Sequence, residues 1–387
     1  MIGKKTLDDG KIIGAVFMDL SRAFDCLPHS LLIAKLHAYG VTEETCQLLC
    51  SYLTSRKQRV KIGNYTSLWN TTYKGVPQGS ILGPILFNVF INDLFFFMDK
   101  CQLYNYADDN SMSSASSNIS DVMCNLHHDT ANAIDWFIRN GMEPNPAKFQ
   151  FMIISSKNIE KLFLRINENV MIPASSDVVL LGITIDEKLR FDKHVDIITK
   201  KAARQVNALS RISRNLDHKS KELINNSFVR SNFSYCPLVW HFCGKSANGK
   251  LEKLHERALR LVLNDPDSDY DDLLVKSGSS SLFTQRLRTI MVEIFKFLKK
   301  ESPSSLESMF QIKEMPHHFR DGIKLIQPIR RTSTFGLRSI SYLGPKLWNS
   351  LPRDLKKLLE ANASTQTFKH ALKSWNPLLC DDFNQYI

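Results

Sequence analysis

Three aspartates have the residue type and spacing that two-metal phosphoryl transfer requires. Asp108 and Asp109 are adjacent, and Asp19 lies about ninety residues earlier. Like charges this close repel, so a fold that keeps them ionised together usually binds divalent cations. Two such ions about 4 Å apart can activate an attacking hydroxyl and stabilise the leaving oxygens of a triphosphate. The acids therefore predict nucleotide polymerisation with Mg²⁺, or alternatively Mn²⁺, as the cofactor.

The hydrophobic pattern places these acids at strand ends. Residues 12–18 form a short apolar run typical of a buried strand, and Asp19 follows it. Residues 102–106 alternate like a half-buried strand, and residues 110–117 read as the return of a hairpin, which leaves Asp108 and Asp109 at its tip. Pairing of the two strands in one sheet would bring Asp19 close to Asp108. The dipeptide alone also fits an ordinary surface turn.

Five motifs carry the strongest signal, and they follow one another in order: VFMDLSRAFDCLPH (16–29), GVPQGSILGPILFNVFINDL (75–94), YADD (106–109), GMEPNPAKFQFMIIS (141–155) and LLGITID (180–186). Together they resemble motifs A to E of the reverse transcriptases of non-LTR retrotransposons, of the LINE-type, jockey-like group. Residues 238–260 and 341–355 also look like the C-terminal region of those polyproteins. The resemblance implies an RNA-directed DNA polymerase whose partners are an RNA template, a DNA primer or target, and dNTPs.

The resemblance also assigns roles to individual residues. Asp19, Asp108 and Asp109 match the catalytic metal ligands of the family. Phe24 matches the ring that excludes a ribonucleotide 2′-hydroxyl, although a core position explains a Phe there equally well. Asp25 fits a helix cap ahead of Pro28 better than a third metal ligand.

Two further motifs match substrate-handling positions. Gln78 and Gly79 resemble the family's dNTP and template contacts, and the glycine-rich turn around them lets backbone approach a substrate. Lys148 matches the lysine that protonates the leaving pyrophosphate, while a solvated surface lysine is the alternative. The apolar run 81–98 has nearly the length of a membrane span, but the Asp within it argues for a buried helix.

The charge distribution favours a nucleic-acid partner. The chain has 50 Lys and Arg against 39 Asp and Glu, a net charge of +11. Between residues 186 and 260, 16 basic residues stand against 8 acidic ones, so most of the excess lies there. Residues 194–209 have apolar positions at helical spacing, with Lys200, Lys201 and Arg204 between them. We expect these three to contact phosphates, the alternative being an ordinary solvated helix face.

The breaks in pattern predict three regions of an α+β protein. Residues 1–186 should form a right-hand polymerase palm, an antiparallel sheet covered by helices, with partial fingers. Residues 187–265 should form a helical, basic thumb, and residues 266–387 a helical and irregular C-terminal region. Only 18 residues precede Asp19, so the fingers of the family are expected to be largely missing.

The remaining composition points to an intracellular protein. The first residues lack the apolar core of a signal peptide, so the eight cysteines are expected to stay reduced in the nucleus or cytoplasm rather than in a secreted protein. Cys236, His241, Cys243 and His255 lack the paired spacing of a zinc site, which favours buried thiols and a packed histidine. The sequence indicates no membrane contact and no particular oligomeric state.

Two hypotheses follow from the sequence. The first is a reverse transcriptase core in which Asp19 and Asp108 bind metal ions, Asp109 assists and Lys148 acts as general acid. The second is a truncated retroelement remnant that binds nucleic acid at most, without catalysis. The intact acids favour the first, and the shortened fingers favour the second.

Overall fold

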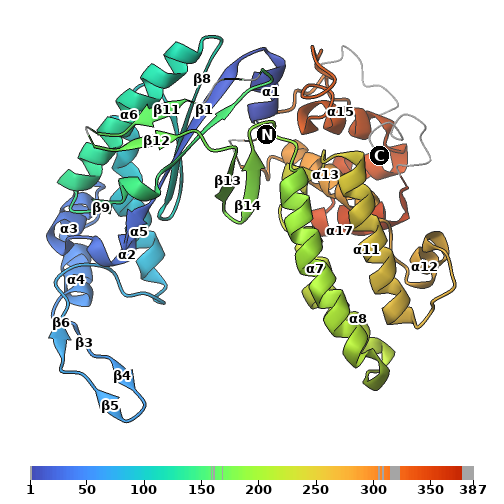
Figure 1. Ribbon diagram of the computed structural model, residues 1–387, viewed down its shortest axis with the longest axis horizontal. Helices are drawn as coiled ribbons and strands as arrows, with labels where there is room; N and C mark the ends of the chain where they lie inside the picture. Colours follow the sequence, from blue (N-terminus) through green and yellow to red (C-terminus); the bar gives the residue numbers. More distant parts are fainter. Residues whose placement is uncertain are drawn as a thin grey trace. The chain divides into compact units, whose positions relative to one another are not determined.

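The computed structural model describes residues 2–157, 159, 162–167, 169–303, 306, 309–313 and 323–376. The chain divides into two compact units (Figure 1). We call residues 10–181 the sheet unit. Residues up to Asp9 together with those from Gly182 onward form the helical unit.

A four-stranded antiparallel sheet is the centre of the sheet unit. Its strand order is β10 (Gln150–Ile154), β1 (Ile12–Met18), β8 (Asp109–Ser116) and β7 (Gln102–Tyr106). The predicted strands at 12–18 and 102–106 are confirmed. The structure corrects their pairing, because β1 pairs with the return strand β8 and not directly with β7. Either side of a hairpin can join a neighbouring strand, and alternation along one strand does not distinguish them.

Helix α6 (Ile119–Arg139) covers one face of this sheet. Asn118 caps it by accepting a hydrogen bond from the Ser120 amide, and Gly141 follows its end with a positive φ of 71°. A side chain at Gly14 of β1 would approach Val122 and Leu126 of this helix to 2.5 Å. Only a glycine therefore lets helix and sheet pack this closely.

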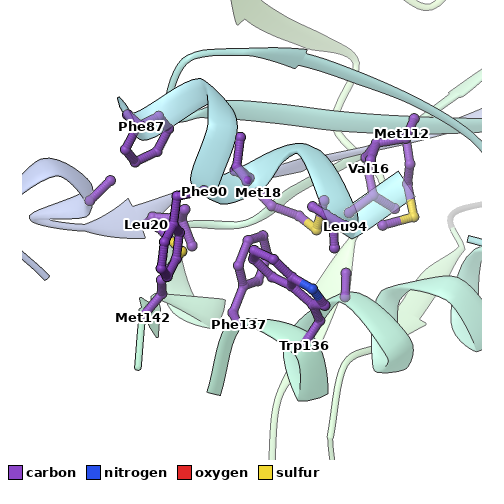
Figure 2. Packing of buried hydrophobic residues seen from close by; sticks show 14 of the residues in the cluster. Val16, Met18, Leu20, Phe87, Phe90, Leu94, Met112, Trp136, Phe137 and Met142 are labelled. Atoms are coloured by element: carbon purple, nitrogen blue, oxygen red, sulfur yellow. The ribbon is translucent and has the colours of Figure 1, made fainter. Parts of the chain in front are cut away.

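The core of the sheet unit lies between the sheet, α6 and the apolar run 81–98, which begins within motif B (Figure 2). That run folds into helix α5 (Leu82–Ile91) and a 3₁₀ turn (Asn92–Phe97), whose Phe90 and Leu94 pack beside Trp136 and Phe137. Each of these four side chains is at most 1% exposed. Among the described residues, no helix combines the length and the apolar character needed to cross a bilayer.

The other elements of the sheet unit flank this core. They are α2 (Ala23–Cys26), α3 (His29–Ala38), α4 (Glu43–Leu53), the paired strands β2 (Leu20–Ser21) with β9 (Glu143–Pro144) and β11 (Phe163–Arg165) with β12 (Met171–Pro173), and β13 (Asp177–Leu180). Between α4 and motif B the chain forms two short ladders, β3 (Lys57–Gln58) with β6 (Asn70–Thr71) and β4 (Lys61–Ile62) with β5 (Tyr65–Thr66).

The helical unit contains one short strand, β14 (Ile183–Asp186), and otherwise helices in its described part. These helices are α1 (Ile2–Asp8), α7 (Asp192–Ile212), α8 (His218–Ile224), α9 (Ser231–Ser234), α10 (Pro237–Trp240), α11 (Lys245–Leu263), α12 (Tyr270–Lys276), α13 (Leu282–Leu298), α15 (Ile340–Ser350), α16 (Arg353–Glu360) and α17 (Thr365–Ala371). They enclose two apolar clusters, one around α7 and α11 and one around α13 and α15. Part of the predicted C-terminal region, residues 314–322 and 377–387, lies outside the described residues.

Candidate active site

Two acids of the candidate site lie at the turn between β7 and β8. Tyr106 pairs with Asp109, so Ala107 and Asp108 form the two-residue turn. Ala107 has a φ of 52°, a conformation that non-glycine residues rarely adopt outside turns and functional sites. The buried Asn110 side chain donates a 2.9 Å hydrogen bond to the Asp108 carbonyl and so holds the turn in this shape.

The register of the sheet brings the third acid to the same edge. Met18 of β1 is paired with Asn110 of β8, so the next residue, Asp19, follows at the end of the sheet where β8 begins with Asp109. The Asn145 amide donates a 3.0 Å hydrogen bond to the Asp19 carbonyl, which fixes the chain where it leaves β1. We call Asp19, Asp108 and Asp109 the acid triad.

The members of the acid triad influence one another electrostatically. Burial, then the charge of Asp108 and then that of Asp19, raise the pKa of Asp109 above its ordinary value. Lys148 Nζ lies 3.4 Å from Asp19 Oδ2. Both of these side chains are more than 45% exposed. This lysine ends a short 3₁₀ turn (Pro146–Lys148) just before β10. The structure thus brings together Asp19, the turn acids and Lys148, and mutual repulsion of the carboxylates fits a site for a divalent cation.

The predicted sugar-gate residue packs against the core. Phe24 of α2 is half-buried, and its ring stacks on Phe87 of α5 at a centroid distance of 4.4 Å. Its carbonyl accepts a 2.9 Å hydrogen bond from the Val76 amide, which links motif A to motif B. This contact supports the core alternative and leaves the gate role a prediction.

The motif B residues Gln78 and Gly79 are exposed at the surface of the sheet unit. Gln78 Nε2 donates to both carboxylate oxygens of Asp25, at 3.1 and 3.2 Å. The residue at the N-cap position of α3 is Pro28, and no side chain accepts a hydrogen bond at the start of that helix. The prediction that Asp25 caps this helix was therefore wrong. Gly79 has a φ of 80°, and a side-chain carbon at this position would meet open space.

The three predicted nucleic-acid contacts lie on α7 of the helical unit. Lys200, Lys201 and Arg204 are exposed, whereas the predicted apolar stripe of this helix is buried: Val195, Ile198, Ala202, Val206 and Leu209. The helix is therefore amphipathic as expected. Its contact with phosphates stays a prediction.

Sequence reasoning missed a second acidic group, formed by Asp99, His128 and Asp129. Their ligand atoms lie within 4.8 Å of one another. The carboxylate of the fully buried Asp129 already accepts hydrogen bonds from the amides of Asp99, Lys100 and Cys101, at 3.3, 2.9 and 2.6 Å. It anchors the loop before β7 and leaves little capacity for an ion. The only sequence signal for this group was an acidic residue, Asp129, on the apolar face of α6.

Comparison with known proteins now decides the family. Residues 4–185 match the model of the reverse transcriptase (RNA-dependent DNA polymerase) family. Residues 4–185 are a reverse transcriptase domain. The four-stranded antiparallel sheet, with the acid triad at one edge, lies within these matched residues.

Curated relatives place this reverse transcriptase in the non-LTR group. The probable RNA-directed DNA polymerase from transposon BS of Drosophila melanogaster is 28% identical over 68% of this chain and 30% of its own length. The polymerase from the mobile element jockey of Drosophila funebris is 22% identical, with the same coverage of both chains. The chain therefore spans less than a third of the length of these relatives.

Solved structures give a more distant likeness. A telomerase from Candida albicans, solved with a fragment of telomeric RNA, is 12% identical to this chain, with a TM-score of 0.34. The match covers 80% of this chain and 53% of the telomerase chain.

Proposed function

We propose that this protein is an RNA-directed DNA polymerase that extends a primer 3′-hydroxyl on an RNA template by two-metal nucleotidyl transfer. The convergence of Asp19 with the β7–β8 turn acids, beside Lys148, is the observation that carries the proposal. The names of the relatives, which are RNA-directed DNA polymerases of mobile elements, support the choice of template and product.

In this proposal Asp19 and Asp108 hold Mg²⁺ or Mn²⁺, and Asp109 assists. Bound divalent ions would lower the pKa of the primer hydroxyl and stabilise the charge that develops on the phosphates. The residues of the chain fit such ions because three carboxylates share one sheet edge. Burial, followed by the charges of Asp108 and Asp19, raises the pKa of Asp109, and a bound cation would offset the repulsion between these carboxylates.

The other residues would position the substrate and transfer protons. The primer oxygen attacks the α-phosphate of the dNTP, and pyrophosphate leaves. Lys148, whose ammonium lies 3.4 Å from Asp19, would donate a proton to the departing pyrophosphate oxygen. Gln78 and Gly79, exposed on the glycine-rich turn, would contact the dNTP and the template. The proposed gate role of Phe24 rests on the motif alone.

Primer extension tests the proposal directly. The full chain should extend a DNA primer on an RNA template with dNTPs and Mg²⁺ or Mn²⁺, and EDTA should abolish the product. Asp108→Asn should reduce extension by several orders of magnitude, because losing one ligand charge costs several kcal/mol of transition-state stabilisation. Asp99→Asn is the matched control and should retain wild-type extension.

Either of two results would contradict the proposal. Asp108→Asn could retain wild-type extension, which would remove the metal assignment. Alternatively, the wild-type chain could bind primer–template without extending it, which is the behaviour of the catalytically silent remnant.

A further inference from the structure

Residues 56–74 form a hairpin, the arm, that projects from the sheet unit beyond α3 and α4 (Figure 1). The chain reverses at Gly63, whose φ is 59°. The Thr72 amide donates to the Arg56 carbonyl at 2.9 Å, and the Ser67 amide donates to Val60 at the same distance. The backbone of the arm is thus ordered by its own ladder.

The base of the arm is fastened next to motifs A and B. The Gly75 amide donates a 2.8 Å hydrogen bond to the Leu27 carbonyl, and the Gly75 carbonyl lies 2.8 Å from His29 Nε2. A side chain at Gly75, whose φ is 84°, would clash with the backbone of Asp25 at 2.7 Å. These contacts fasten the base of the arm at Gly75, three residues before Gln78.

The arm exposes an unusual amount of apolar and aromatic surface. Six large side chains are between 56% and 87% exposed: Val60, Ile62, Tyr65, Leu68, Trp69 and Tyr73. A two-stranded hairpin buries little on its own, and exposed patches of this kind mark interaction sites. Three of the six are aromatic rings, which can stack on bases.

The charge of the arm is entirely positive. Residues 56–74 contain five basic residues and no acid: Arg56, Lys57, Arg59, Lys61 and Lys74. The Arg59 guanidinium lies 4.5 Å from the ring centre of Trp69, so charge and aromatic surface occur side by side. Within the described part of the chain, Lys57, Lys61 and Lys74 are exposed and held in no ion pair.

A cavity of about 1830 Å³ continues this basic surface from the base of the arm toward motif B. Arg22, Arg56, Lys57 and Lys74 line it, together with Gln78 of motif B. The one carboxylate in the lining, Asp25, already accepts hydrogen bonds from Gln78. The lining therefore suits a polyanion.

We propose that the arm and this cavity bind single-stranded nucleic acid. The rings of Tyr65, Trp69 and Tyr73 stack on bases, and the surrounding lysines contact phosphates. A single strand fits better than a duplex because only unpaired bases offer free faces for stacking. The inference rests on the proposed function only for the identity of the strand, which would be the template approaching the palm.

Tryptophan fluorescence gives a direct test. Of the five tryptophans, Trp69 is 56% exposed, and the other four are at most 7% exposed. Stacking of a base on Trp69 should quench the fluorescence of the full chain. We expect quenching by a single-stranded RNA oligonucleotide and none by a blunt duplex. A parallel titration with a single-stranded DNA oligonucleotide of the same sequence shows whether the strand must be RNA. Trp69→Phe should remove the quenching while leaving a ring to bind.

Binding measured by fluorescence anisotropy completes the test. Tyr65→Ala with Trp69→Ala should weaken single-strand binding by about tenfold or more, since base–aromatic stacking is worth that much. Phe96→Ala with Lys100→Gln is the matched control, because both residues are exposed in the same unit and belong neither to the arm nor to the cavity lining, and it should bind as the parent does.

The outcomes separate this inference from the proposed function. Unchanged single-strand affinity in the arm variant, or an equal loss for duplex, would overturn the inference. All measurements omit dNTPs and metal ions. Failed primer extension with intact single-strand binding would therefore count against the polymerase proposal alone.

Discussion

At the scale of single residues, the acid triad concentrates negative charge at one sheet edge. Burial and the neighbours Asp108 and Asp19 raise the pKa of Asp109, so its ionised form is disfavoured in the folded chain. Because the folded pKa lies above the unfolded one, any stabilising contribution from Asp109 is present below the unfolded pKa and is lost as pH rises through the folded pKa. At neutral pH the charge of Asp109 should therefore destabilise the metal-free protein.

Asp109→Asn should consequently raise the melting temperature at pH 7 in EDTA, with a gain in stability of about 0.2–1 kcal/mol, the scale of exposed charge pairs. The gain should disappear as pH falls to the unfolded pKa of an Asp side chain, about 3.9, and Mg²⁺ should raise the melting temperature of the wild type more than that of the variant. Asp99→Asn removes an exposed carboxylate outside the triad and should not gain. A stability gain that is independent of pH would show that charge repulsion is not its cause.

Some of the site could be predicted from residue patterns, and some could not. The strand before Asp19 and the hairpin around Asp108 have local signals, so their positions were expected. The hydrogen bonds from Gln78 to Asp25 join residues 53 positions apart, and no local pattern encodes them. The carboxylate of the buried Asp129 accepts hydrogen bonds from backbone amides of the loop before β7. This role depends on how helix α6 and the loop pack together, which the sequence does not show.

At the scale of elements, α7 combines a buried apolar face with an exposed basic one. If Lys200, Lys201 and Arg204 contact phosphates, each releases about one counterion when duplex binds. Replacing all three with Gln should therefore flatten the slope of log K against log salt by about three units. The measurement is a salt titration of primer–template binding to the full chain.

A matched variant makes this salt titration specific. Arg353, Lys369 and Lys373 are exposed basic residues elsewhere in the helical unit, and their replacement by Gln removes the same net charge. The control should keep the parental slope. Equal slopes in the α7 variant and the parent would show that this helix face is only solvated.

Element patterns also explain what the sequence could and could not predict about the fold. The 3.6-residue spacing in α7 and the capping Asn118 before α6 are local and predict helices well. The order of β1, β8 and β7 depends on which edge of the hairpin meets β1, which the alternation of residues 102–106 does not encode. A glycine such as Gly63 favours the turn of a hairpin, so the arm has a local sequence signal. Its exposure depends on how the rest of the sheet unit packs, which the sequence does not encode.

At the scale of the whole molecule, the first residues belong to the helical unit. The buried carboxylate of Asp8 accepts hydrogen bonds from the Thr332 amide and hydroxyl, both at 2.8 Å, and from the Arg331 amide. Lys4 Nζ donates to the Arg338 carbonyl at 3.0 Å. Segments more than 320 residues apart in sequence thus stabilise each other.

Asp8→Ala should destabilise the helical unit by about 1–3 kcal/mol, because it leaves buried donors without an acceptor. Hydrogen–deuterium exchange should accelerate in residues 331–350 and stay unchanged in β1 and β8. The neighbouring exposed Asp9 provides the control, since Asp9→Ala should leave both regions protected. Faster exchange throughout the chain would contradict this division into two units.

The central claim is that the acid triad holds the catalytic metal ions. Electron paramagnetic resonance can count Mn²⁺ bound to the full chain in a stalled complex with RNA template, dideoxy-terminated primer and the next dNTP. We predict about two ions per wild-type chain, a clear loss in Asp19→Asn and in Asp108→Asn, and no change in Asp99→Asn. Full occupancy in both triad variants, or a loss confined to Asp99→Asn, would contradict the account.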